Sequence, residues 1–77
     1  MSEIATRVRK VVADILHVDD AKMTMDARFV QDLGAESIKA MELIAAFEEE
    51  FSIELDEDEA LACKTIGSAI RHIEERL

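Results

Sequence analysis

A serine at the junction of a predicted loop and a predicted helix is the residue best placed for chemistry in this 77-residue chain. Gly34, three residues earlier, permits a backbone turn that a β-carbon would resist. Ser37 is the expected N-cap of the helix, because its hydroxyl can accept hydrogen bonds from first-turn N–H groups. A phosphate ester on its oxygen would meet the same N–H groups and the positive end of the helix dipole. The position therefore suits a modified serine as well as a capping serine.

The rest of the chain gives Ser37 no catalytic partner. A nucleophilic serine needs a base and an orienting group, but His17 and His72 are expected only to stabilise helix C-termini. The carboxylates of residues 56–59 lack the spacing of a calcium loop. Cys63 has no Cys/His cluster around it and is expected to be a small buried hydrophobe. We predict no enzymatic activity, no catalytic residue and no metal site.

The composition favours helices, since the chain has no proline and only two glycines. No apolar run approaches the ~20 residues of a membrane span, and the first residues lack the apolar stretch of a signal peptide. A lone cysteine forms no internal disulfide, so nothing indicates secretion. We expect a cytoplasmic protein with no membrane insertion.

The net charge of −9 lies almost wholly in the middle of the chain. Residues 29–62 contain eleven acidic residues and Lys39 as their only base. Such a surface repels nucleic acid and favours fast encounters with proteins that carry basic patches. The alternative is that the acids only keep a small protein soluble.

Four helical segments are predicted from apolar spacing and end signals. The first begins near Ser2 and ends near Leu16 or His17, the second spans residues 37–51, the third residues 56–62, and the fourth runs from Thr65 to the end. Asp56 and Thr65 are the expected N-caps of the last two. The apolar faces of the first and fourth helices are expected to be Ile4, Val8, Val11, Val12 and Ile15, and Ile66, Ile70, Ile73 and Leu77.

Residues 17–36 form a connection with no clear period, which compact domains seldom contain unless it is packed down or functional. A short helical turn is expected where Asp19 and Asp20 precede Lys22. The expected anchors to the core are Val18, Met23, Met25, Phe29, Val30 and Leu33.

The second helix has two apolar faces, whereas simple bundle packing needs only one. The expected core face consists of Ala40, Leu43, Ile44, Phe47 and Phe51. Ile38, Met41 and Ala45 form a second, narrower stripe that begins beside Ser37 and is flanked by carboxylates. The stripe is either an exposed docking surface, for which a charged rim is typical, or a contact for the long connection.

Residues 29–38 and the acidic helix behind them resemble the acyl carrier proteins, in which an Asp-Ser-Leu motif carries 4′-phosphopantetheine on its serine. Here the motif reads Glu36-Ser37-Ile38. The resemblance covers essentially the whole chain. It implies an all-α fold with a single acyl-carrier-like domain over residues 1–77, a small four-helix bundle with a long first loop and a short third helix.

The resemblance also implies the function. A phosphopantetheinyl transferase would attach the arm from coenzyme A to Ser37, and acyl groups would then travel as thioesters between enzymes of fatty-acid, specialised lipid or secondary-metabolite synthesis. Synthases or ligases with basic patches would dock on Glu36, Ile38, Met41, Glu42, Ala45, Glu48 and Glu49 of the monomer. The helices would part to shelter an acyl chain, and the short aliphatic core residues that could permit this are Val8, Ile15, Leu43, Ile66 and Ile70.

Four positions depart from the family pattern. Glu36 replaces aspartate, Ile38 replaces leucine, His17 stands where many members have glycine, and Leu55 where many have proline. These departures favour a specialised carrier with its own enzymes. The alternatives are an aminoacyl or D-alanyl carrier, a non-carrier acidic interaction protein in which Ser37 only caps a helix, and, last, a divalent-ion binding module.

Overall fold

The computed structural model describes residues 3–77 and contains four α-helices and one 3-10 turn within that range. The first helix, α1, spans Glu3–Leu16 and buries Ala5, Val8, Val11 and Val12 along one face. Its expected N-cap, Ser2, lies outside the described residues. The helix ends at His17, whose φ of 57° is left-handed and whose N–H donates to Ala13 O at 2.8 Å. A residue with a β-carbon therefore occupies the conformation that glycine adopts most easily.

The other helices follow the predicted bounds closely. Helix α2 spans Ser37–Phe51, α3 spans Glu57–Leu61, and α4 spans Ile66–Arg76. Asp56 caps α3 by accepting from the Glu59 N–H at 3.0 Å. Thr65 caps α4 in a capping box with Ser68. These caps satisfy N–H groups that the first turn of each helix leaves free.

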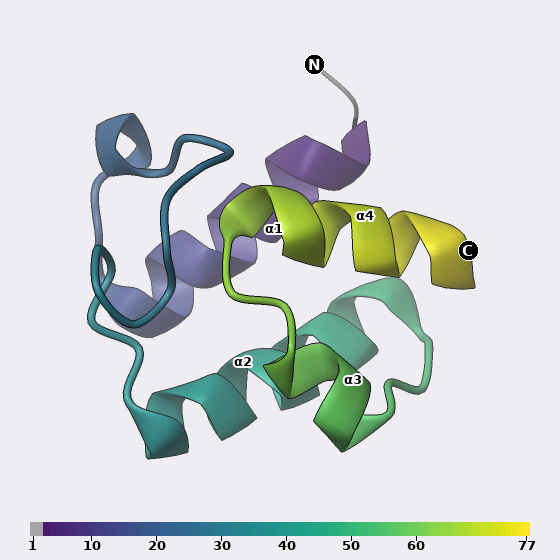
Figure 1. Cartoon of the computed structure of the whole chain (residues 1–77). Helices are drawn as coiled ribbons and strands as arrows, with labels where there is room; N and C mark the ends of the chain where they lie inside the picture. Colours follow the sequence, from purple (N-terminus) through teal and green to yellow (C-terminus); the bar gives the residue numbers. More distant parts are fainter. Residues whose placement is uncertain (1–2) are drawn as a thin grey trace.

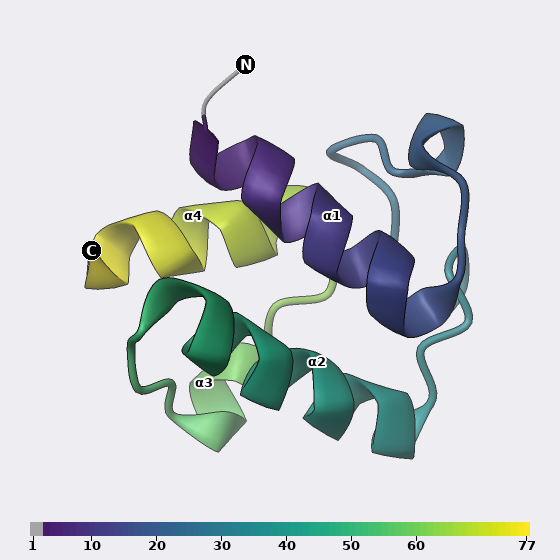
Figure 2. The same ribbon diagram turned by 180° about the vertical axis from the view of Figure 1, so that it is seen from behind.

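The four helices form a small all-α bundle around one core (Figure 1). Helix α1 packs against both α2 and α4, while the short α3 packs against α2 (Figure 2). The most completely buried large side chains are Val8 and Val12 of α1 and Ile66 and Ile73 of α4. Among the residues expected on the apolar faces of the first and fourth helices, Leu77 is exposed: it follows the last turn of α4 and keeps 62% of its surface accessible.

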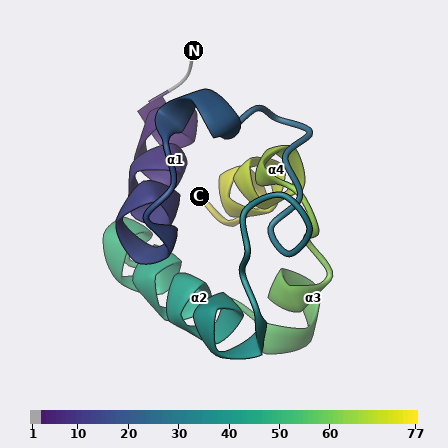
Figure 3. The ribbon, with the colours of Figure 1, turned by 90° about the vertical axis from the view of Figure 1, so that its left-hand side faces the viewer.

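Residues 17–36 pass beside the start of α4 before they enter α2 (Figure 3). Three backbone N–H groups make this contact: Phe29 N donates to Lys64 O at 2.9 Å, Ile66 N to Ala27 O at 3.0 Å, and Gly67 N to Met25 O at 2.9 Å. The connection is therefore held by sheet-like hydrogen bonds as well as by side chains. These hydrogen bonds explain how a long segment with little helix of its own keeps a defined conformation.

The side-chain anchors of this connection were predicted only in part. Met23 and Leu33 are buried, and Val18 and Phe29 are partly buried against the core, as expected. Met25 and Val30 are exposed instead, and at Met25 the backbone carbonyl makes the contact by accepting the Gly67 N–H. Ala27 and Ala35 are buried in their place. The predicted short turn is present as the 3-10 helix η1, Asp20–Lys22.

The second glycine, Gly67, has a packing role that the sequence did not reveal. A β-carbon there would lie 3.0 Å from the Met25 carbonyl oxygen, which also accepts the Gly67 N–H. The close approach of two backbones leaves no room for a side chain without a shift of one of them. Gly67 therefore lets the long connection lie against the first turn of α4.

Candidate functional site

The turn before α2 is built from backbone hydrogen bonds over residues 28–36. Asp32 N donates to Arg28 O at 3.0 Å, and the Asp32 carboxylate accepts from the Arg28 backbone N–H at 2.8 Å. Hydrogen bonds and charge from Arg28 hold the pKa of the Asp32 carboxyl below its usual range. Gly34 has a φ of 75°, the left-handed conformation predicted for it, and open space around it. Its role is therefore conformational.

The N-cap of α2 is the residue before Ser37, and Ser37 itself was expected in that position. Glu36 is the N-cap, because its backbone is extended and its carbonyl accepts the Ala40 N–H at 2.9 Å. Ser37 is the first residue of α2, so the prediction that it caps the helix is wrong. The Glu36 side chain makes no capping hydrogen bond either. The Ser37 side chain is exposed, and the first-turn N–H groups lack intrahelical partners, as in every α-helix.

An apolar groove of about 980 Å³ extends from Ser37 between α2, α3 and α4. Its walls include Leu43 and Phe47 of α2, Leu61 of α3 and Ile73 of α4. Of the five aliphatic residues expected to shelter a chain, only Leu43 lines it; Val8, Ile15, Ile66 and Ile70 do not. The other four belong to the packed core or lie against it.

Three polar side chains of the α3–α4 side also line the groove: Cys63, Lys64 and His72. The Cys63 thiol is partly buried and donates to Glu59 O at 3.6 Å. Burial raises its pKa, and the carboxylates of Glu59 and Glu75 raise it further. The thiol is therefore mostly protonated near neutral pH and weakly nucleophilic.

The second apolar stripe of α2 is exposed, which answers the question left open by the sequence. Ile38 keeps 76% of its surface accessible and Met41 43%, and Ala45 is exposed as well. The stripe does not pack under the long connection. The core face is as predicted: Leu43, Phe47 and Phe51 are buried, and Ala40 and Ile44 are partly buried.

The carboxylates around this stripe differ in how exposed they are and in whether they accept a hydrogen bond. Glu36, Glu42 and Glu49 are exposed, although Lys39 lies 3.6 Å from a Glu42 oxygen. Glu48 is partly buried, and its carboxylate accepts the Leu55 N–H at 2.9 Å. Glu48 therefore also holds the loop between α2 and α3.

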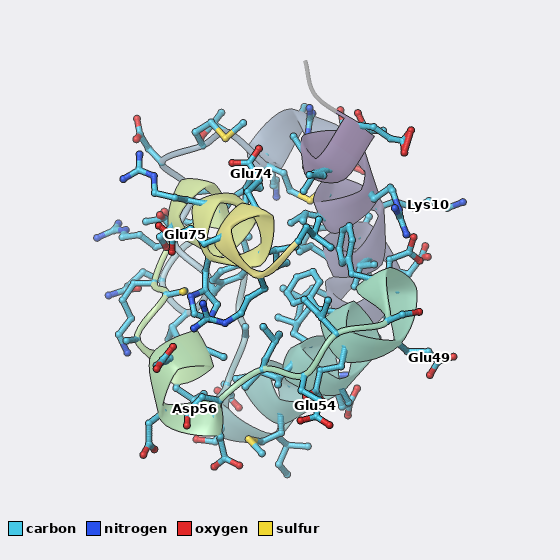
Figure 4. The ribbon with its side chains drawn as sticks, turned by 90° about the vertical axis from the view of Figure 1, so that its right-hand side faces the viewer. Lys10, Glu49, Glu54, Asp56, Glu74 and Glu75 are labelled. Atoms are coloured by element: carbon cyan, nitrogen blue, oxygen red, sulfur yellow. The ribbon has the colours of Figure 1, made fainter. Side chains whose placement is uncertain are left out.

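The acidic surface continues past the end of α2. In Figure 4, Glu49 of α2, Glu54 of the following loop and Asp56 before α3 lie along one side of the molecule. All three residues are exposed. Charges arranged in this way produce a field that a basic partner would meet before contact.

Neither histidine makes a hydrogen bond to Ser37 in the part of the chain that the structure describes. His17 ends α1 and does not line the groove. His72 does line it, a position that the sequence did not suggest, since helical spacing alone does not say which side of α4 faces α3. Within residues 3–77 no three His, Cys, Asp or Glu side chains gather as a metal site would require.

An exposed serine at the start of a helix, beside an apolar groove and an acidic surface, defines the class of small helical carrier proteins that bear a prosthetic arm. Comparison with known proteins agrees. The family described as "Phosphopantetheine attachment site" matches residues 6–73, which is most of the chain.

Two curated relatives are similar over nearly their whole length. The chain is 48% identical over 77 residues to an acyl carrier protein of Phenylobacterium zucineum (strain HLK1), covering 100% of this chain and 98% of the relative. It is also 48% identical over 75 residues to an acyl carrier protein of Sinorhizobium fredii (strain NBRC 101917 / NGR234), covering 97% and 96%. The chain belongs to the acyl carrier protein family, whose members carry acyl groups on covalent 4′-phosphopantetheine and are not enzymes.

Among the helices of residues 3–77, none combines the length and the apolar character needed to cross a bilayer.

Proposed function

We propose that Ser37 is the attachment site of 4′-phosphopantetheine and that the chain delivers acyl groups between enzymes of fatty-acid or specialised lipid or secondary-metabolite synthesis. The observation that carries this proposal is the exposure of Ser37 at the start of α2, where the groove begins. The terminal thiol of the arm supplies the thioester linkage. The unusual Glu36 and Ile38 beside the serine favour a specialised pathway over general fatty-acid synthesis.

The residues around Ser37 fit a phosphodiester. The first-turn N–H groups of α2 point toward the helix start, where no side chain of Glu36 caps them, and they can donate to phosphate oxygens. Because Glu36 is the N-cap, the Ser37 oxygen is not needed to cap the helix. In arm transfer this oxygen would form a bond to the phosphorus nearest the pantetheine, the pyrophosphate bond of coenzyme A would break with adenosine 3′,5′-bisphosphate as the leaving group, and the serine proton would pass to a base of the transferase.

The partners proposed are a phosphopantetheinyl transferase and acyl-transferring, synthase or ligase enzymes with basic patches. Ile38, Met41 and Ala45 offer them an exposed apolar strip next to the serine. Glu36, Glu42, Glu48 and Glu49 flank this strip. A small apolar contact with an acidic rim allows fast binding and fast release, as a shuttle between enzymes requires. Of these carboxylates Glu48 is the least available, because it also binds the Leu55 N–H.

The groove supports an acyl cargo over the aminoacyl and D-alanyl alternatives. Its lining is dominated by aliphatic and aromatic side chains, and it begins at Ser37. An alkyl chain folded back from the arm would bury apolar surface there, whereas a small charged amino acid would gain little. The proposal further includes action as a monomeric domain of residues 1–77 in the cytoplasm, consistent with the single cysteine.

The test is arm transfer to the purified protein. Coenzyme A, magnesium and a broad-specificity transferase are added to the wild type, to Ser37→Ala and to the control Ser52→Gly. Ser52 is the matched control because it is exposed and its φ of 54° suits glycine. The wild type and the control should each gain the mass of one arm, and the peptide containing Ser37 should bear it. A gain in Ser37→Ala, or none in the wild type, contradicts the proposal and favours a non-carrier interaction protein.

A further inference from the structure

The wall of the groove that α3 forms is held less firmly than the walls that α2 and α4 form. Helix α3, Glu57–Leu61, buries none of its residues, and Leu61, which lines the groove, keeps 38% of its surface accessible. A helix of five residues is too short to be stable on its own. Segments with few buried apolar contacts open at the lowest cost in free energy. Helix α3 is therefore the wall of the groove that can move.

The other two walls are fixed by the core. Helix α2 buries Leu43, Phe47 and Phe51, and α4 buries four apolar residues. Arg7 of α1 also binds the end of α2. Its guanidinium donates to the Glu50 carboxylate at 2.8 Å and to the Glu50 carbonyl oxygen at 2.6 Å, and it lies 4.5 Å from the centre of the Phe51 ring. These contacts oppose any movement of α2 away from α1.

Polar contacts hold α3 and its flanking residues in place. Before the helix, the Leu55 N–H donates to the Glu48 carboxylate of α2 at 2.9 Å. After it, the Cys63 thiol donates to the Glu59 carbonyl oxygen at 3.6 Å. The third contact joins α3 to the last turn of α4, since the Arg76 guanidinium donates to the Glu59 carboxylate. Of these three contacts, only the Glu59–Arg76 pair reaches α4.

The Glu59–Arg76 pair lies at the edge of the groove. Ala60, the residue after Glu59, and Ile73, three residues before Arg76, both line it. Figure 4 shows the same arrangement, with α3 following the labelled Asp56 and lying below α4. A change in the distance between Glu59 and Arg76 therefore changes the width of the groove on this side.

The strength of this pair depends on salt. The Glu59 side chain is 56% exposed and the Arg76 side chain 35%, so dissolved ions screen the attraction between them. An exposed ion pair adds little to the stability of a well-packed helix. Helix α3 buries no residue, so the same small contribution is a large part of what holds it against α4.

We propose that the Glu59–Arg76 ion pair is a salt-sensitive clamp that holds α3 against α4 and sets how far the groove beside Ser37 opens. When the pair breaks, α3 moves while α1, α2 and α4 keep their packing. The clamp acts in the chain without a prosthetic arm. This inference therefore goes beyond the function proposed above, and it can fail or hold independently of the attachment to Ser37.

The experiment compares the wild type without the arm with Arg76→Gln, Glu59→Gln and the variant that carries both changes. Arg71→Gln and Glu57→Gln are the matched controls. Arg71 and Glu57 are exposed, lie on the same two helices, and form no ion pair with any residue of 3–77. All of these substitutions change exposed side chains, so every variant is expected to fold.

The first readout is amide hydrogen exchange followed by NMR. The Ala60 N–H reports α3, because it donates to Asp56 O at 2.9 Å within that helix. The Val12 N–H reports the whole fold, because Val12 is fully buried in α1. Loss of an exposed ion pair predicts that Ala60 exchanges roughly 1.5-fold to fivefold faster at low salt, while Val12 exchange stays the same.

The second readout is the reaction of Cys63 with iodoacetamide, since this partly buried thiol lines the groove. Burial raises the pKa of the thiol, and the carboxylates of Glu59 and Glu75 raise it further. Loss of the Arg76 cation would leave these carboxylates less balanced, which alone would slow the reaction. A faster reaction of Arg76→Gln, by the same factor as the Ala60 exchange, therefore reports opening of the groove.

Equal acceleration of Ala60 exchange in Arg76→Gln, Glu59→Gln and the double variant supports the clamp, provided that both controls match the wild type. The difference from the wild type should also disappear in about 1 M KCl. Unchanged Ala60 exchange in Arg76→Gln overturns the proposal. Equal acceleration of Val12 overturns it too, because the pair then stabilises the whole fold. Additive effects in the double variant overturn it as well, because the two side chains then act independently.

Discussion

Replacing Ile38 with alanine should separate docking from stability. Ile38 is 76% exposed in the first turn of α2, so the lost carbons make few contacts in the free protein. Alanine is also the better helix former, by about half a kcal/mol. We therefore expect the free energy of unfolding to change by less than ~0.5 kcal/mol.

The effect on docking follows from the surface that a partner can still cover. Ile38→Ala removes three carbons, each worth about 0.8 kcal/mol when buried. With 76% of the residue available for burial, the loss on full docking is at most ~1.8 kcal/mol. This corresponds to a decrease in kcat/KM for arm transfer of up to about twentyfold, and of about fivefold if the side chain is only partly covered.

The assay follows intact mass over time during arm transfer, with the carrier concentration varied to obtain kcat/KM, alongside thermal unfolding. Leu77→Ala is the matched control, since Leu77 is 62% exposed and lies at the opposite end of the molecule from the start of α2 (Figure 2). The control should keep wild-type kinetics. Unchanged kcat/KM in Ile38→Ala, or an equal loss in Leu77→Ala, would refute docking on this stripe.

Two other positions give independent predictions. Gly67→Ala should lower the free energy of unfolding by about 1 kcal/mol, because its β-carbon would lie 3.0 Å from Met25 O. This loss should outweigh the better helix propensity of alanine. Thermal unfolding should show a Tm several degrees lower, and a higher Tm would contradict the close approach. Cys63 should react with iodoacetamide more slowly than free cysteine at pH 8, since its raised pKa leaves less thiolate. Glu75→Gln should lower that pKa and speed the reaction, and an unchanged rate would exclude a contribution of the Glu75 carboxylate to the raised pKa.

The helices were predictable because their signals are local. Asp56 and Thr65 are capping residues at the right distance from an apolar pattern, and both cap their helices in the structure. The apolar positions Val8, Val12, Ile66 and Ile73 repeat with helical spacing and form the centre of the core. The two apolar faces of α2 could be predicted equally well, since both follow from a rotation of about 100° per residue.

Other features depend on contacts between distant segments. Met25 and Val30 were predicted as anchors because they are apolar, but their segment is held by backbone hydrogen bonds to the start of α4. No local pattern encodes that pairing, nor the resulting requirement for glycine at position 67. The groove could not be located from the sequence for the same reason. Its location depends on how α3 packs against α2, and apolar spacing within one helix does not determine which neighbour a face meets.

The error at Ser37 has a physical consequence for the proposed attachment. If Ser37 were the N-cap, its hydroxyl would serve the helix, and a bulky ester there would remove a stabilising hydrogen bond worth about 1 kcal/mol. With Glu36 as the N-cap, that cost does not arise. Burial of Leu33 and Ala35 meanwhile fixes the backbone just before the site, and exposure begins at Glu36. A modified serine can thus be held on a rigid turn while its own side chain remains free for the enzymes that must reach it.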